Sequence, residues 1–300
     1  MTERRLPGGR SFGAVLADGE VRRPAQPWTE TVHSVLRHLE DAGFDGAPRA
    51  RGFDEQGRER LTFLPGQTLG ETAPWPDWVR SDDALRQVGA WLRRLHDATS
   101  TFRPTADAVW FTRRPWQPGL VIAHLDASPW NAVWADGALT GFVDWDTASP
   151  SRREDDLAFS ALMWVPLLTA EVAEPAGFGN AADRRRRFHL LLDAYGYTGD
   201  RTAIRDAIIG RVERNVAMIR QLADGGEPTF QRMLPWTCNG PGTKWLSCRT
   251  SSGRGRADDR GCPGSFPRQV ASWLVCDSGG AALLLYALPV PCTGRVRRDR

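Results

Sequence analysis

Apolar residues recur at every third or fourth position in five stretches of the chain, which is the spacing of helices that bury one face. The predicted helices cover residues 29–42, 81–95, 157–168, 184–195 and 201–223. Ser81 has the kind of side chain favoured at a helix N-terminus, and Gly43 ends the first helix. Helices therefore dominate the chain from Ser81 onward.

Shorter apolar runs bounded by turn residues predict β-strands, most of them near the N-terminus. The runs are 13–16 and 20–23 around the turn Ala17-Asp18-Gly19, then 50–53, 60–63, 119–124 and 139–143. Leu64-Pro65-Gly66 interrupts the pattern and indicates a hinge. We therefore expect an α+β chain, with a small antiparallel sheet and one helix over residues 1–65 and a mainly helical part over 66–236.

The pattern changes after about residue 234. No glutamate follows Glu227, no histidine follows His189, and all five cysteines lie beyond residue 237 without Cys-x2-Cys spacing. A zinc site is therefore not expected. Residues 237–300 are predicted to be an atypical tail, either disordered or loosely packed. A sharper hypothesis is that the reading frame shifts near Pro235, so that the tail is translated out of frame.

Composition limits the choice of function without deciding it. Hydrophobic residues make up 41% and charged residues 25% of 300 residues, which fits a globular protein with a sizeable core. A net charge of +3 does not indicate nucleic-acid binding. The N-terminus has no long apolar run, so neither a signal peptide nor a membrane span is expected. Because the first 237 residues lack cysteine, we expect a cytoplasmic protein.

The strongest chemical signal lies between residues 121 and 146. An apolar run leads into His124-Leu125-Asp126, Asn131 follows Asp126 by five positions, and a second apolar run ends at Asp144. Phosphoryl transfer needs a carboxylate that accepts or orients the attacking hydroxyl, together with metal ions that neutralise the phosphates. Carboxylate and amide oxygens suit Mg²⁺. We expect two adjacent strand ends to bring Asp126, Asn131 and Asp144 around one cavity, while His124 holds the loop.

This pattern resembles the catalytic and metal-binding loops of the aminoglycoside phosphotransferases and related protein-kinase-like enzymes. The resemblance runs from about residue 8 to 233 and includes Pro129-Trp130-Asn131 and Asp144-Trp145-Asp146. It implies a bilobal kinase-like fold with ATP, or alternatively GTP, in the cleft. It also implies Asp126 as catalytic base, Asn131 and Asp144 as Mg²⁺ ligands, and Asp156 as the anchor of the catalytic loop.

The family usually has a lysine on its third strand that holds the α- and β-phosphates, and this chain departs from that pattern. Its only lysine is Lys244, and Arg23 (or Arg22) stands at the corresponding point. Arginine can also bind phosphate through two hydrogen bonds. The partner glutamate of the family is matched best by Glu30. Gly8 and Gly9, with Gly13, are candidates for a loop that covers the phosphates.

The resemblance implies that the acceptor is a small molecule with a hydroxyl group, with an aminoglycoside first and choline-like, macrolide or sugar-like molecules left open. Carboxylates such as Asp146, Glu154 and Asp155 would suit a cationic acceptor.

Each assignment has a plainer alternative. Asp126, Asn131 and Asp144 are residue types that favour ordinary turns. His124 is more readily structural than catalytic, Asp146 is either an extra metal ligand or a solvated carboxylate, and Arg23 could be a surface residue of an edge strand. The arginines at 184–187 are predicted to form a solvated helix face. The alternative at the level of function is a kinase-fold relic that binds nucleotide without turnover.

Overall fold

The computed structural model describes residues 3–6, 13–69, 75–165, 167, 177–178, 181–226 and 231, together with two short strands at 271–273 and 285–287. The N-terminal part is an antiparallel sheet of five strands in the order β1-β2-β3-β5-β4. Its strands are β1 (Arg4–Arg5), β2 (Val15–Ala17), β3 (Glu20–Pro24), β4 (Ala50–Phe53) and β5 (Arg58–Thr62). Helix α1 (Thr29–Asp41) connects β3 to β4.

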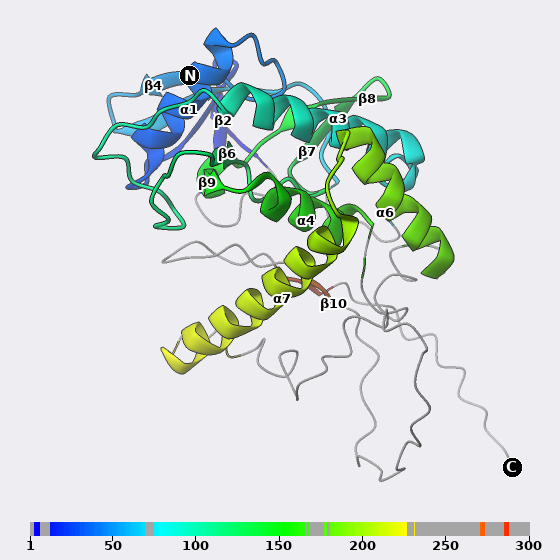
Figure 1. Ribbon diagram of the computed structural model, residues 1–300. Coiled ribbons are helices and arrows are strands. Elements are labelled where there is room, and N and C mark those ends of the chain that lie inside the picture. The colour runs from blue at the N-terminus through cyan, green and yellow to red at the C-terminus, as the bar shows by residue number, and fades with distance from the viewer. Residues whose placement is uncertain are drawn as a thin grey trace, which may run out of the picture.

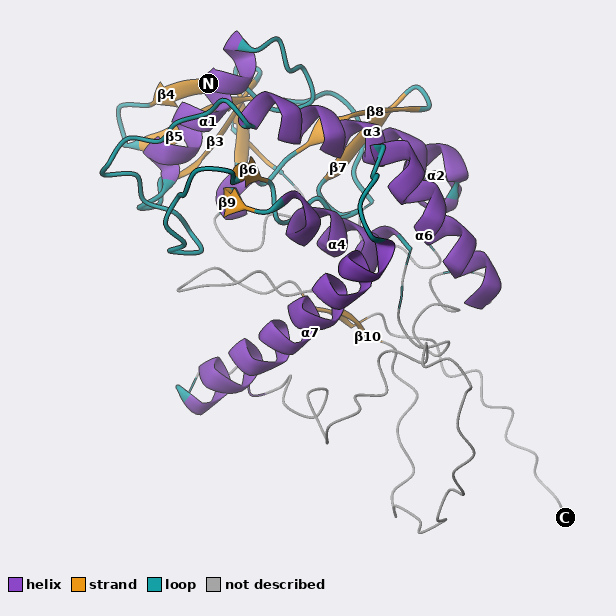
Figure 2. Cartoon of the chain, in the orientation of Figure 1, coloured by secondary structure: helices purple, strands orange, loops and turns teal. Residues whose placement is uncertain are grey.

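Helices are the longest elements of the remaining described chain (Figures 1 and 2). They are α2 (Asp77–Arg80), α3 (Asp82–Thr99), α4 (Arg153–Trp164), α6 (Ala181–Tyr195) and α7 (Arg201–Asp224). Ser81 caps α3, as predicted, by accepting a hydrogen bond from the Ala84 N–H at 3.0 Å. Helix α3 packs against α6, and α4 packs against α7.

Two small two-stranded sheets lie between α3 and α4 in the chain. Strand β6 (Val121–Ala123) pairs antiparallel with β9 (Ser149–Ser151), and β7 (Ala132–Ala135) pairs antiparallel with β8 (Ala138–Phe142). The strands predicted near residues 119–124 and 139–143 therefore do not pair with each other, since each pairs with a strand that the sequence did not predict. Strands β7 and β9 were not predicted, because β7 is short and β9 contains Pro150, which lacks the N–H that a strand interior uses.

One buried core joins these parts. A single cluster includes Val35 and Leu36 of α1, Leu92 of α3, Phe142 of β8 and Leu157 of α4. The carbonyl oxygen of Gly46 accepts hydrogen bonds from Trp91 Nε1 at 2.9 Å and from the Phe142 N–H at 3.2 Å.

Gly141 allows this close approach to the loop after α1. A Cβ at this position would lie 2.4 Å from the Gly46 oxygen, and its φ of +155° also favours glycine. The contact fixes β8, and therefore the segment that follows it, against the N-terminal part of the chain.

Several predicted elements are confirmed, with shifted boundaries. The hairpin around Asp18 and the strand pair joined at 54–57 are present, and Leu64-Pro65-Gly66 lies in a loop. Helix α4 begins at Arg153, four residues earlier than predicted, because its first turn is acidic and apolar periodicity starts only afterwards. The division into lobes at residue 65 stays a prediction.

The predicted solvated face at residues 184–187 is only half right. Arg185 and Arg186 are exposed, but Arg184 and Arg187 are buried. Arg187 donates to the carbonyl oxygens of Arg80 at 2.5 Å and of Trp164 at 3.1 Å, at the ends of α2 and α4. A basic side chain at a helix C-terminus satisfies carbonyl groups that have no partner within the helix, so Arg187 joins three helices.

The tail predicted at residues 237–300 lies outside the described residues, apart from β10 (Ala271–Trp273) and β11 (Leu285–Ala287), which pair antiparallel. In the part of the chain that the structure describes, no helix has both the length and the apolar character required to span a bilayer.

Candidate active site

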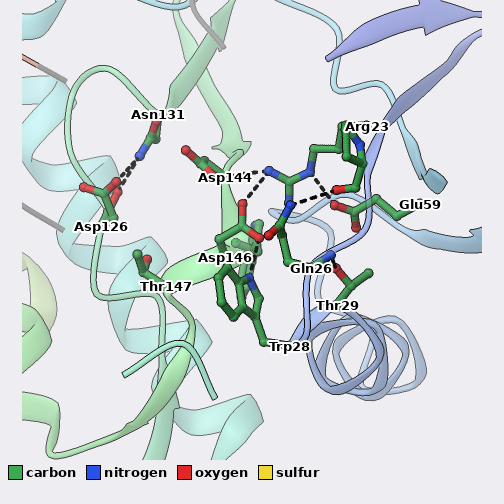
Figure 3. A network of polar contacts seen from close by, with 12 residues as sticks. Arg23, Gln26, Trp28, Thr29, Glu59, Asp126, Asn131, Asp144, Asp146 and Thr147 are labelled. Atoms are coloured by element: carbon green, nitrogen blue, oxygen red, sulfur yellow. Dashed lines mark hydrogen bonds and ion pairs between the residues drawn. The ribbon is translucent and has the colours of Figure 1, made fainter. Parts of the chain in front are cut away.

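The loop from His124 to Asn131 connects β6 to β7 and carries the predicted base. Leu125 adopts a positive φ of 61°, which turns the chain sharply after the strand. Asn131 Nδ2 then donates to the Asp126 carboxylate at 2.8 Å and to the Asp126 carbonyl oxygen at 3.0 Å (Figure 3). The amide nitrogen of Asn131 thus faces Asp126, which turns its amide oxygen the other way.

A network of buried hydrogen bonds from Asp156, His96 and Tyr195 holds this loop in place. Asp156 accepts hydrogen bonds from the Leu125 N–H at 2.8 Å and from His96 Nε2 at 2.9 Å, and its side chain is fully buried. His96 Nδ1 contacts the Tyr195 hydroxyl at 2.9 Å. Burial acts to raise the pKa of Asp156, but the hydrogen bond from His96 and the Leu125 N–H lower it below its ordinary value. Asp156 is therefore placed to stabilise the strained turn at Leu125.

His124 has its side chain in the core. Its Nδ1 accepts a hydrogen bond from the Asp126 N–H at 3.2 Å, and its carbonyl oxygen accepts one from the Thr147 hydroxyl at 2.7 Å. Its ring lies 4.8 Å from that of Trp145. Burial lowers the pKa of His124 to about 4, although Asp156 opposes the shift. A neutral imidazole that orients the Asp126 backbone fits the structural reading of this residue.

Asp144 follows β8 directly and adopts a left-handed conformation, with φ at 63°. Its side chain keeps 45% of its exposure. Crowding by the surrounding protein, and then the negative charge of Asp146, raise the pKa of Asp144 to about 7, while Arg23 opposes the shift. Asp126 contributes to the same shift, so the two carboxylates lie within electrostatic reach of each other. A bound cation would favour the charged form of Asp144.

Arg23 lies on β3, the third strand, and faces three carboxylates. Its Nε donates to Glu59, and its Nη1 donates to Asp146 at 2.6 Å and to Asp144 at 3.3 Å (Figure 3). Trp28 Nε1 donates to the other oxygen of Asp146 at 2.7 Å. Because β3 lies in the middle of the sheet and the Arg23 side chain is only 12% exposed, the alternative of a surface arginine on an edge strand is wrong.

The structure corrects two further expectations. Asp146 is a buried carboxylate that binds Arg23 and Trp28, so it is not simply solvated. Glu30 is exposed, and the glutamate that binds Arg23 is Glu59 of β5.

Gly8 and Gly9 lie outside the described residues. Gly13 lies within them and has a positive φ of 65°. Asp155 pairs with Arg152 at 2.9 Å and with Arg114 at 3.5 Å, so it is already neutralised by arginine.

Sequence reasoning missed Glu59, Trp28 and His33. Glu59 sits directly opposite Arg23 in the sheet, and its second carboxylate oxygen contacts His33 Nε2 at 3.0 Å. Strand β5 reads Arg58-Glu59-Arg60-Leu61-Thr62, so Glu59 does not stand out from its charged neighbours, and only the strand register shows its partner.

The chemistry of the donors fits a Mg²⁺–nucleotide group. Asn131 and Asp144 offer an amide oxygen and a partly exposed carboxylate close to Asp126, and Mg²⁺ in such sites completes its ligands with phosphate oxygens and water. Among the described residues, no cluster of three or more His, Cys, Asp and Glu side chains forms a metal site by itself. The donor set therefore suits a metal that arrives with phosphates better than a permanently bound one.

The fold and the order of these residues define a protein-kinase-like small-molecule phosphotransferase. Residues 105–189 match the model of the phosphotransferase enzyme family (APH), and this stretch contains Asp126, Asn131, Asp144 and Asp156. The chain is also 40% identical over 196 residues to the trifolitoxin immunity protein of Rhizobium leguminosarum bv. trifolii. The aligned region covers 64% of this chain and 73% of that protein. The chain belongs to the phosphotransferase enzyme family.

Solved structures show the same fold at low sequence identity. A macrolide 2'-phosphotransferase from Brachybacterium faecium aligns with a TM-score of 0.51 at 17% identity, over 80% of this chain and 93% of that one. An amicoumacin kinase in complex with AMP-PNP, Ca²⁺ and Ami aligns with a TM-score of 0.53 at 11% identity, over 77% of this chain and 87% of that one. Both likenesses concern the fold alone.

Proposed function

We propose that the protein transfers the γ-phosphoryl group of ATP, bound together with Mg²⁺, to a hydroxyl group of a small polar molecule. The observation that carries this proposal is the pairing of Asp126 with Asn131 on a loop anchored by Asp156. Asp126 accepts or orients the proton of the acceptor hydroxyl, whose oxygen bonds to the γ-phosphorus while the bond from that phosphorus to the β–γ bridging oxygen breaks and ADP leaves. Asn131 and Asp144 are the proposed Mg²⁺ ligands.

The charges around Arg23 support a nucleotide that binds with divalent metal. One guanidinium faces Glu59, Asp146 and Asp144, so acidic side chains outnumber basic ones there. A triphosphate alone would be repelled, whereas metal ions bound to Asp144 and to phosphate oxygens would offset this excess. Within the described residues, Arg23 Nη2 donates to no protein acceptor and could bind a phosphate oxygen.

For the acceptor, we propose an antibiotic or toxin with a free hydroxyl group. The relative named for immunity to trifolitoxin and the solved macrolide and amicoumacin enzymes support this class. The pairing of Asp146 and Asp155 with arginines weakens the case for a strongly cationic aminoglycoside at those two residues. An aminoglycoside, a sugar-like molecule and choline remain alternative acceptors, and the assay below includes them.

The direct test is Mg²⁺-dependent consumption of ATP, with GTP in parallel, against macrolides, amicoumacin, trifolitoxin, amino sugars and choline. We expect consumption that depends on one acceptor class, with one phosphoryl group added to that acceptor by mass spectrometry. The alternative, a relic that keeps the kinase fold, is favoured by the absence of the usual lysine. Tight nucleotide binding without transfer to any acceptor would support the relic.

A further inference from the structure

Arg23 uses two of its three side-chain nitrogens on protein carboxylates. Nε donates to Glu59, and Nη1 donates to Asp146 and Asp144. Because a guanidinium is planar and rigid, fixing Nε and Nη1 also fixes the direction of Nη2. The groups that hold Arg23 therefore decide where its remaining nitrogen points.

Glu59 is the residue that fixes the Nε side. It lies opposite Arg23 in the β3–β5 register, and its side chain is 1% exposed. A carboxylate buried to this degree requires a charged or hydrogen-bonding partner for each oxygen. Arg23 binds one oxygen and His33 of α1 binds the other at 3.0 Å. Glu59 thus connects Arg23 to helix α1.

His33 is buried at this contact. Its side chain is 1% exposed, and its ring lies 5.1 Å from that of Phe53 on β4. It is held between a sheet residue and Glu59. A displacement of α1 would therefore be transmitted through His33 to Glu59 and then to Arg23.

The first residues of α1 also reach the same guanidinium by a second route. Trp28, at the N-cap of α1, donates to Asp146, and Asp146 in turn accepts from Arg23 Nη1. Both routes begin on α1 and end on Arg23. The three acidic partners of Arg23 among the described residues come from β5 and from the segment after β8, and none of them lies on helix α1.

We propose that Glu59 and His33 are positioning residues, which direct the Arg23 guanidinium toward the nucleotide phosphates and make its position depend on helix α1. This inference rests on the proposed function, because it names residues that act on the same nucleotide site. A histidine on the helix and a glutamate on the neighbouring strand together do the work that the family resemblance assigned to a glutamate on the helix.

The test compares nucleotide binding and kinetics in Glu59→Gln and His33→Ala with two matched controls. Glu20→Gln removes an ion pair between the same strands, to Arg60 at 2.8 Å, and His38→Ala removes a histidine of the same helix that contacts the Ala98 carbonyl oxygen. Binding of AMP-PNP with Mg²⁺ is measured by calorimetry, kcat and KM by turnover, and folding by urea midpoint.

We expect Glu59→Gln to weaken nucleotide binding about tenfold, because a charge-assisted hydrogen bond is lost. His33→Ala should weaken it about fivefold, and His33→Gln, which keeps an N–H donor, should restore most of the affinity. KM for the nucleotide should rise while kcat changes little, since Arg23 contacts phosphates in the ground state and the transition state alike. The two controls should keep wild-type affinity even where their urea midpoints fall.

The Arg23 Nε–H signal in NMR gives a readout without nucleotide, and Arg23→Lys assigns it. Slow exchange of this proton in the wild type and its loss in Glu59→Gln would support the positioning role. Wild-type affinity and KM in both Glu59→Gln and His33→Ala would overturn it while leaving the proposed function intact. Failure of the wild-type protein to bind any nucleotide would overturn the proposed function instead, before any variant is compared.

Discussion

Beneath the catalytic loop, Asp156 is fully buried and each of its oxygens accepts a hydrogen bond, whereas around Arg23 three carboxylates share one guanidinium. The first region is a closed network from Tyr195 through His96 to the Leu125 N–H. The second has an excess of acidic groups and one exposed carboxylate, Asp144. The difference separates a structural support, which is complete without ligand, from a site whose charges call for one.

The largest expected effect is on catalysis and comes from Asp126, which lies on the catalytic loop above the Asp156 network. We expect Asp126→Ala to lower kcat by about 10²–10⁴-fold with nucleotide affinity little changed, because a general base contributes about that much. Single-turnover transfer and AMP-PNP binding measure the two quantities. Asp107→Ala, at an exposed aspartate outside the catalytic loop, is the control. Transfer at the wild-type rate in Asp126→Ala would show that Asp126 is not the catalytic base.

The second prediction breaks the support itself. Asp156→Ala should lower the free energy of unfolding by about 3–5 kcal/mol, because His96 and the Leu125 N–H lose a buried charged partner. Urea unfolding measures this loss, and Glu154→Ala in the same helical turn should cost far less. A loss in Asp156→Ala no larger than in Glu154→Ala would mean that the network does not hold the loop.

The third prediction uses pH to test whether His124, at the start of the catalytic loop, is buried in its neutral form. The pKa of His124 is lowered from 6.5 to about 4 on folding, so the unfolded chain binds an extra proton between these values. Stability should therefore fall by about 3 kcal/mol as the pH is lowered from 7 to 4, from this group alone. His124→Asn, which keeps an acceptor for the Asp126 N–H, should show a correspondingly smaller fall. Parallel stability profiles in urea would contradict the burial of a neutral His124.

The fourth prediction concerns the open region. Arg23→Lys should weaken nucleotide binding by about tenfold, because a single ammonium cannot reach Glu59 and Asp146 in the same geometry and still bind phosphate. Calorimetry with AMP-PNP and Mg²⁺ measures the change. Arg22→Lys is the matched control, since the neighbouring Arg22 pairs with Asp18 at 2.9 Å and not with the site carboxylates. Equal affinities in both variants would argue against phosphate binding by Arg23.

The smallest effect is expected at the outer end of the closed network. Tyr195→Phe removes the hydroxyl that contacts His96 and should lower stability by about 1 kcal/mol, the typical value of one hydrogen bond. Tyr197→Phe removes a hydroxyl with only a 3.4 Å contact to a backbone oxygen and should cost less. Urea midpoints compare the two. A larger loss of stability in Tyr197→Phe would mean that the Tyr195–His96 hydrogen bond does not contribute to this network.

The amino-acid sequence by itself determined the class of fold and the residues of the catalytic loop. Apolar periodicity located α1, α3, α6 and α7, because a helix that buries one face repeats its pattern within a single segment. The spacing of His124, Asp126, Asn131 and Asp144 is equally local, so it could be read along the chain. The family membership confirms the fold and enzyme class that this spacing suggested.

Only the tertiary structure decided which partners these residues have. Arg23 meets Glu59 through strand register. Asp146 accepts hydrogen bonds from Arg23 and from Trp28 across more than one hundred residues, and no local pattern encodes such contacts. Whether a charged side chain is buried or solvated also depends on what packs against it. For this reason the sequence predicted a solvated Arg187 and left two alternatives open for Asp146. Periodicity is a property of one segment, whereas pairing of buried charges is a property of several segments brought together by the core.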